Sequence, residues 1–155
     1  MKRLDTNEWN DLERGLQALA ALGVEGGAQI ATLAATGEGL VLNAAFPEPH
    51  KSPLQIDIDR KSQTVCASFG RGIQVSDYAL DVPWLLALAR RVSNGEWRER
   101  CVYFGSNLYS SRATLLVGER EETFSGTDIW TIRPQRPRRL EVAYTPWNVI
   151  NTPPP

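Results

Sequence analysis

The stretch Leu54-Gln55-Ile56-Asp57-Ile58-Asp59 alternates apolar and polar residues at every position. This alternation predicts a β-strand with one face in the core and the other in solvent. The residues that follow, Asp59-Arg60-Lys61-Ser62, are typical of a turn, so we expect residues 63–69 to return as the antiparallel partner. The fold should therefore be built around an antiparallel sheet.

The residues on either side of this hairpin extend the sheet. Residues 28–35 and 40–46 are short apolar runs joined by a Gly-containing turn, which predicts a second hairpin. Pro47 to Pro53 holds three prolines and is expected to be a loop. Residues 73–75 add a short candidate strand after Gly70-Arg71-Gly72. Four or five consecutive strands are thus expected.

One helix should precede this run of strands in the sequence, and a second helix should follow it. Asp5 is a good N-cap with Glu8 three residues later, and apolar residues then recur at helical spacing until Gly23, where we expect the helix to end. The second helix is expected over residues 82–93, capped by Asp81.

The rest of the chain looks entirely β. The candidate strands in it are residues 97–104, 112–118, 121–125, 128–133 and 139–144. Since strands come in consecutive runs, we expect an α+β fold with an antiparallel sheet of about seven to nine strands and two helices packed on it, in the order α-ββββ(β)-α-ββββ(β). Residues 1–144 should form one domain, and 145–155, which include Trp147, a loosely attached Pro-rich tail.

The composition of the chain excludes few functional classes. The chain has 155 residues and a net charge of −1, so the whole molecule offers no strong field to nucleic acid or to a membrane. No apolar run is long enough to span a bilayer and no signal peptide is visible, which makes a soluble, cytoplasmic protein the expectation. Cys66 and Cys101 form no CxxC motif, and we expect both to be buried free thiols.

Catalytic motifs are scarce. His50 is the single histidine, so a nucleophilic triad would have to combine it with a cysteine or a carboxylate. We keep an enzyme of this kind as an alternative, but we expect no catalysis, no cofactor and no metal site. Gly70-Arg71-Gly72 could bring backbone amides to an anion, although a plain turn is the simpler interpretation.

Charged and aromatic side chains supply the candidate binding residues. Asp57 and Asp59 share one strand face, where they could form a site or simply face solvent. Glu121 and Glu122 lie in a charged turn, and Tyr109 lies in an apparently exposed loop over residues 105–111. Four arginines form a separate candidate anion-binding cluster: Arg133, Arg136, Arg138 and Arg139.

These observations favour a non-enzymatic module that binds another protein. Its most concrete form is a bacterial inhibitor of the immunity type, which neutralises a toxin by covering a basic surface with acidic side chains. The contact residues would be Asp57, Asp59, Tyr109, Glu121 and Glu122. The alternatives are the small enzyme using His50, and phosphate or nucleic-acid binding through the Arg133–Arg139 cluster, with nucleic acid disfavoured by the overall charge.

Overall fold

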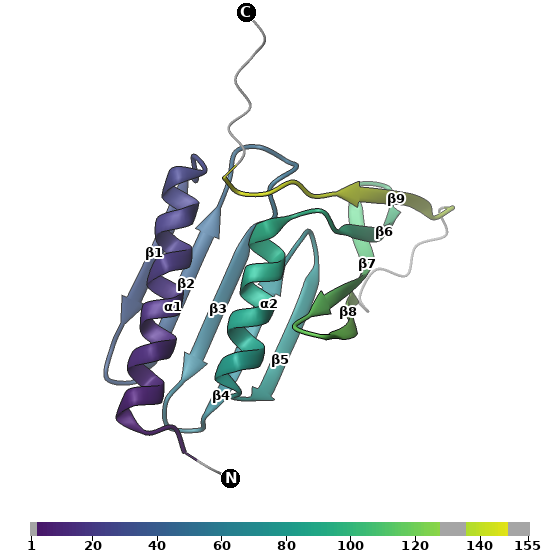
Figure 1. Ribbon diagram of the computed structural model, residues 1–155. Helices are drawn as coiled ribbons and strands as arrows, with labels where there is room; N and C mark the ends of the chain where they lie inside the picture. The colour runs from purple at the N-terminus through teal and green to yellow at the C-terminus, as the bar shows by residue number, and fades with distance from the viewer. Residues whose placement is uncertain (1–2, 128–135, 149–155) are drawn as a thin grey trace, which may run out of the picture.

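The computed structural model describes residues 3–127 and 136–148 of the chain. In these residues one helix, five strands, a second helix and four strands follow one another (Figure 1). The helices are α1 (Thr6–Glu25) and α2 (Val82–Asn94). The strands are β1 (Ile30–Ala35), β2 (Gly39–Ala45), β3 (Leu54–Asp59), β4 (Thr64–Phe69), β5 (Ile73–Ala79), β6 (Arg98–Phe104), β7 (Asn107–Val117), β8 (Arg120–Thr127) and β9 (Arg138–Ala143).

The α+β prediction is confirmed, but the strands form two sheets and not one. Sheet A is an antiparallel meander in the order β1-β2-β3-β4-β5, and sheet B has the order β8-β7-β6-β9. A β-bulge opposite Cys66 places Asp77 at φ 53° and distorts β5, the edge strand nearest sheet B. The pairing with β4 resumes beyond the bulge at Val65 and Tyr78. On its other side β5 lies against β8 without a ladder, so the two sheets remain separate.

Both helices cover the same face of sheet A (Figure 1). The apolar side chains of the alternating strands point toward them, as the LQIDID stretch predicts, and Leu54, Ile56 and Ile58 are each about 1% exposed. The helices contribute Trp9, Leu12, Leu16 and Leu19 from α1 and Leu85, Leu88, Ala89 and Val92 from α2. The core therefore lies between this face and the helices.

The beginnings of both helices agree with the sequence. Asp5 accepts a hydrogen bond from the Glu8 amide at 2.8 Å, while the Asp5 amide donates to the Glu8 carboxylate at 2.9 Å, so the expected capping box is complete. Asp81 caps α2 through the amide of Trp84 at 3.1 Å.

The predicted end of the first helix at Gly23 is wrong. Helix α1 continues to Glu25 and is capped by Gly26. Gly23 is buried, and a Cβ there would lie 3.0 Å from the Cβ of Ala31 on β1. This glycine lets the helix approach the sheet closely.

The segment after β9 runs back across the ends of the two helices (Figure 1). Trp147, expected in a loosely attached tail, is 0% exposed. Its indole N–H donates to the carbonyl of Ser52 at 2.9 Å, and its amide donates to the carbonyl of Ser93 at 3.0 Å. The described part of the tail is thus held by specific contacts, and residues 149–155 lie outside the described residues.

Two further differences concern strand limits. Strand β7 begins at Asn107, so most of the expected loop over residues 105–111 is strand. The expected strand over residues 128–133 lies outside the described residues. In the part of the chain that the structure describes, no helix is long and apolar enough to cross a membrane.

Candidate functional site

The face of sheet A that points away from the helices is not covered by any helix or strand of the described residues (Figure 1). We call it the open face. Its side chains occupy the outward positions of all five strands. They are Ile30, Thr32, Ala34, Val41, Asn43, Ala45, Gln55, Asp57, Asp59, Thr64, Cys66, Ser68, Gln74, Ser76, Asp77 and Ala79.

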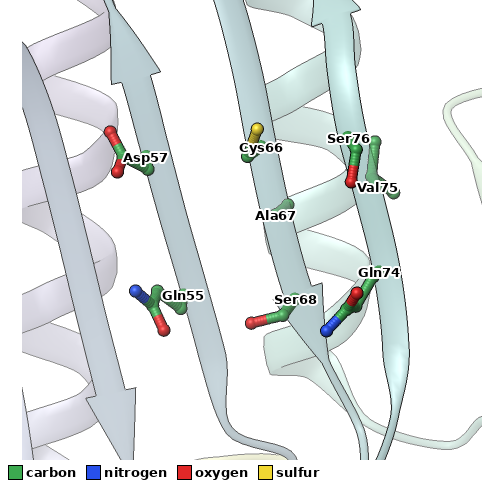
Figure 2. A pocket seen from close by; sticks show the side chains of 8 residues that line it. All are labelled: Gln55, Asp57, Cys66, Ala67, Ser68, Gln74, Val75 and Ser76. Atoms are coloured by element: carbon green, nitrogen blue, oxygen red, sulfur yellow. The ribbon is translucent and has the colours of Figure 1, made fainter. Parts of the chain in front are cut away.

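The register arranges these side chains in rows across the sheet. One row is neutral and polar on every strand and consists of Thr32, Asn43, Gln55, Ser68 and Gln74. Figure 2 shows the central part of the open face, where the polar side chains of β3, β4 and β5 surround a shallow depression. Amide and hydroxyl groups in such a row can donate and accept hydrogen bonds.

The neighbouring row contains two acidic side chains, Asp57 and, at the bulge of β5, Asp77, whose carboxylate accepts the Cys66 thiol at 3.8 Å. Asp57 is opposite Val41 on one side and Cys66 on the other. The Asp57 carboxylate makes no hydrogen bond or ion pair with the described residues, so it is free to meet an external partner.

Asp59, another acidic side chain of this face, is hydrogen-bonded within the β3–β4 turn. Its carboxylate accepts hydrogen bonds from the amides of Lys61 at 2.7 Å and Ser62 at 3.0 Å. The bonds to Ser62 and Lys61 hold the pKa of Asp59 below its usual value. Asp59 therefore shapes the β3–β4 turn at the rim of the open face, while Asp57 lies within it (Figure 2).

The two cysteines differ, which corrects the expectation that both are buried. Cys66 is exposed on the open face, where its Sγ receives the amide of Asp77 at 3.5 Å. Cys101 is 1% exposed on the inner side of sheet B. Burial, together with the nearby Glu99 carboxylate, raises the pKa of the Cys101 thiol to about 11.

The remaining predicted contact residues lie on sheet B. Tyr109 is half-buried on β7, with its ring 5.2 Å from that of Phe104, so it is not an exposed loop residue. Glu122 faces inward and accepts a hydrogen bond from the Trp84 indole at 2.7 Å. Glu121 is exposed on the outer face of β8. These three residues do not share the open face with Asp57 and Asp59.

No catalytic arrangement surrounds His50. It is exposed in the loop between β2 and β3, and its backbone carbonyl accepts the amide of Thr145 at 2.7 Å. Among residues 3–127 and 136–148, the imidazole makes no hydrogen bond to a thiol or a carboxylate. The same residues contain no group of three or more His, Cys, Asp and Glu side chains that could hold a metal ion.

The amides of the Gly70-Arg71-Gly72 turn do bind an anion, which is the carboxylate of Glu99 in the same protein. The buried carboxylate of Glu99 accepts the Arg71 amide at 2.8 Å, the Gly72 amide at 3.2 Å and the Tyr144 hydroxyl at 2.6 Å. Burial first, and then this bond to Glu99, raise the pKa of Tyr144. The turn thus anchors sheet B to sheet A, which sequence reasoning missed because it cannot pair Glu99 with a turn 27 residues away.

The arginines of the predicted C-terminal cluster do not form one surface, because Arg138 and Arg139 lie on opposite faces of β9. Arg136, Arg138 and Arg139 are exposed, and Arg133 lies outside the described residues. The guanidinium of Arg138 lies 5.2 Å from the Tyr103 ring centre, whereas Arg139 lies on the outer face of sheet B.

Sequence reasoning also missed a cluster on that outer face. Arg98 and Arg100 alternate with buried residues on β6, and Arg112 on β7 is directly opposite Arg100. The alternation of Arg98 and Arg100 is visible in the sequence, but the position of Arg112 depends on the strand register. Comparisons with protein-family models, with curated proteins and with solved structures found no match for this chain.

Proposed function

We propose that this protein is a non-enzymatic module that binds a partner protein on the open face of sheet A. The observation that carries the proposal is the shortage of charge on a large exposed sheet face. Of its sixteen side chains, only those of Asp57, Asp59 and Asp77 are charged, and none is basic or aromatic. The centres of protein interfaces are depleted of charged residues in the same way.

The shape of the open face also supports a macromolecular partner. The central depression is shallow, and small side chains such as Cys66, Ser68 and Ser76 line it (Figure 2). Small-molecule sites are usually concave and largely enclosed. A flat surface of short side chains suits another flat surface, because few side chains lose rotamer freedom when it is covered.

The chemistry of the face indicates what the partner should carry. The neutral row through Asn43, Gln55 and Ser68 can form hydrogen bonds with polar groups exposed on the partner. Asp57 calls for a Lys or Arg opposite it, since a charge covered at an interface needs a counter-charge. All three charges on the face are acidic, which favours a partner with a basic surface, such as a toxin neutralised by an immunity-type inhibitor.

A matched pair of substitutions tests the proposal. Gln55→Lys places a bulky charge at the centre of the open face, and Gln17→Lys makes the same change on the exposed side of α1. Tagged wild-type protein and both variants would be used to capture proteins from a lysate of the source cells. We expect one protein to be retained in near-equal amount by the wild type and by Gln17→Lys, and to be lost with Gln55→Lys.

Two results would contradict the proposal. A partner retained equally by all three proteins would locate binding away from the open face. A partner lost with Gln17→Lys and retained with Gln55→Lys would assign binding to the helical side. Both variants should unfold at the wild-type temperature, because both side chains are exposed.

A further inference from the structure

The outer face of sheet B contains a groove of about 540 Å³. Arg91 from the last turn of α2, Arg98 and Arg100 from β6, and Arg112 from β7 all line it. We call it the arginine groove. Glu96 and Glu141 also line it, so four basic side chains are accompanied by two acidic ones.

Two of these arginines form no ion pair with a described residue. Arg100 and Arg112 are directly opposite each other on neighbouring strands, where like charges destabilise a sheet. On its other side Arg100 is opposite Glu141, but the Glu141 carboxylate is bonded to Arg98 at 3.0 Å. One acidic side chain therefore accompanies three arginines on these strands, which points to an external anion.

Arg91 adds a fourth basic side chain to the lining of the groove. Its Nη2 donates to the backbone carbonyl of Glu96 at 3.3 Å, which fixes the side chain at the wall of the groove. Arg91 therefore contributes a positive charge that is already held in place next to the arginines of β6 and β7.

We propose that the arginine groove binds a compact phosphate group with two or more negative charges, such as a diphosphate. The donors come from a helix and from two strands, and therefore from more than one direction. A tetrahedral phosphate offers acceptor oxygens on all sides, while a carboxylate offers two in one plane. Guanidinium groups match phosphate oxygens in a bidentate geometry.

The groove favours a small ligand over a nucleic acid. Glu96 and Glu141 would repel a long polyanion that follows the groove. The one aromatic residue that lines it, Trp97, is 3% exposed and has its indole bonded to the carbonyl of Val92, so it offers no stacking surface for a base. This site lies on a different sheet from the open face and is independent of the proposed protein partner.

Titration calorimetry with inorganic pyrophosphate tests the proposal. We expect saturable binding of one pyrophosphate per chain to the wild-type protein. The double substitution Arg100→Ala and Arg112→Ala should weaken the affinity by roughly 10-fold to 100-fold, because it removes charge-assisted hydrogen bonds. The double substitution Arg100→Lys and Arg112→Lys keeps both charges but loses the forked geometry, so an intermediate affinity is expected.

Arg120→Ala is the matched control, since Arg120 is exposed on the same sheet but does not line the groove. It should bind pyrophosphate like the wild type. Absence of saturable binding to the wild type, or equal affinity of the double alanine variant and the wild type, would overturn the proposal. Tighter binding of a single-stranded oligonucleotide or of an oligoglutamate peptide than of pyrophosphate would also overturn it. The alanine variants should fold, because Arg100 and Arg112 are exposed.

Discussion

The two sheets each expose one face, and the two faces differ sharply in charge. The open face of sheet A carries three charges, all of them acidic: Asp57, Asp59 and Asp77. The outer face of sheet B carries six charges, namely Arg98, Arg100, Arg112, Arg139, Glu121 and Glu141. One chain has thus produced a sheet surface with few charges, all acidic, and a predominantly basic one.

This difference shows that solvent exposure alone does not explain the open face. Sheet B meets solvent with long charged side chains, as exposed surfaces usually do. An exposed sheet surface with so few charges resembles the centre of a protein interface. This contrast supports our proposal that a protein covers the open face, and our proposal that the outer face of sheet B holds a small anion while it stays in water.

The largest effect should come from separating the two sheets. Glu99→Ala leaves the amides of Arg71 and Gly72 and the hydroxyl of Tyr144 without their buried acceptor. We expect the free energy of unfolding to fall by about 3 kcal/mol or more, measured by urea denaturation.

Glu99→Gln sharpens this prediction. Its amide oxygen can still accept a bond from the turn, but its NH₂ group faces a donor, so a smaller loss is expected. Equal stability of Glu99→Ala and the wild type would show that the Gly70-Arg71-Gly72 turn does not depend on the carboxylate.

A second effect concerns the stability at alkaline pH, which depends on the buried thiol of Cys101. The folded protein holds the Cys101 thiol neutral up to a pKa of about 11, while the unfolded chain loses this proton near the ordinary thiol pKa of 9.0. The unfolded state then binds fewer protons, so the free energy of unfolding should fall by about 2 kcal/mol as pH rises from 9 to 11. Urea denaturation across this range would show the slope. In Cys101→Ala the fall should be smaller, and parallel curves for the two proteins would refute the assignment.

A third effect concerns the charge within the open face. Asp57→Ala should weaken the affinity for the captured partner by roughly tenfold, since it removes one partner of an interfacial charge pair. Its free energy of unfolding should change by less than about 0.5 kcal/mol, because the carboxylate has no described partner. Glu121→Ala on sheet B is the control and should leave the affinity unchanged. Calorimetry of the three proteins with the partner would reveal the opposite order if the docking surface lay on sheet B.

The smallest effect should appear on sheet B. Arg112→Gln relieves repulsion with Arg100 and should raise the free energy of unfolding by about 0.3 kcal/mol at low salt. Arg98→Gln breaks the 3.0 Å contact with Glu141 and should lower it by a similar amount. Both shifts should vanish in 1 M salt, where exposed charges are screened. Shifts of the same sign for the two variants would contradict this assignment of the charges.

Local patterns were enough to predict much of sheet A and of the two helices. The alternation in LQIDID fixes which side of β3 is buried, and Asp5 and Asp81 mark where the helices begin. These features depend on residues within a few positions of one another. Asp57 could for the same reason be assigned to an outward strand position before the structure was known.

Long-range features could not be predicted. The pairing of Arg100 with Arg112 depends on a strand register, and the role of Glu99 depends on a turn in the other sheet. The sequence predicts a helix end at Gly23, because a local pattern does not reveal the tertiary contact between Gly23 and Ala31 of β1. The charge depletion of the open face emerges only when outward residues from five strands are placed side by side.

The exposed thiol of Cys66 allows the most direct test of the central claim. Cys66 lies within the open face beside Asp57, and the other thiol, Cys101, is buried (Figure 2). The rate of maleimide labelling at Cys66 would be measured with and without a saturating amount of the captured partner. We predict that the partner slows labelling at least tenfold. An unchanged rate in the saturated complex would show that the open face stays exposed and is not the docking surface.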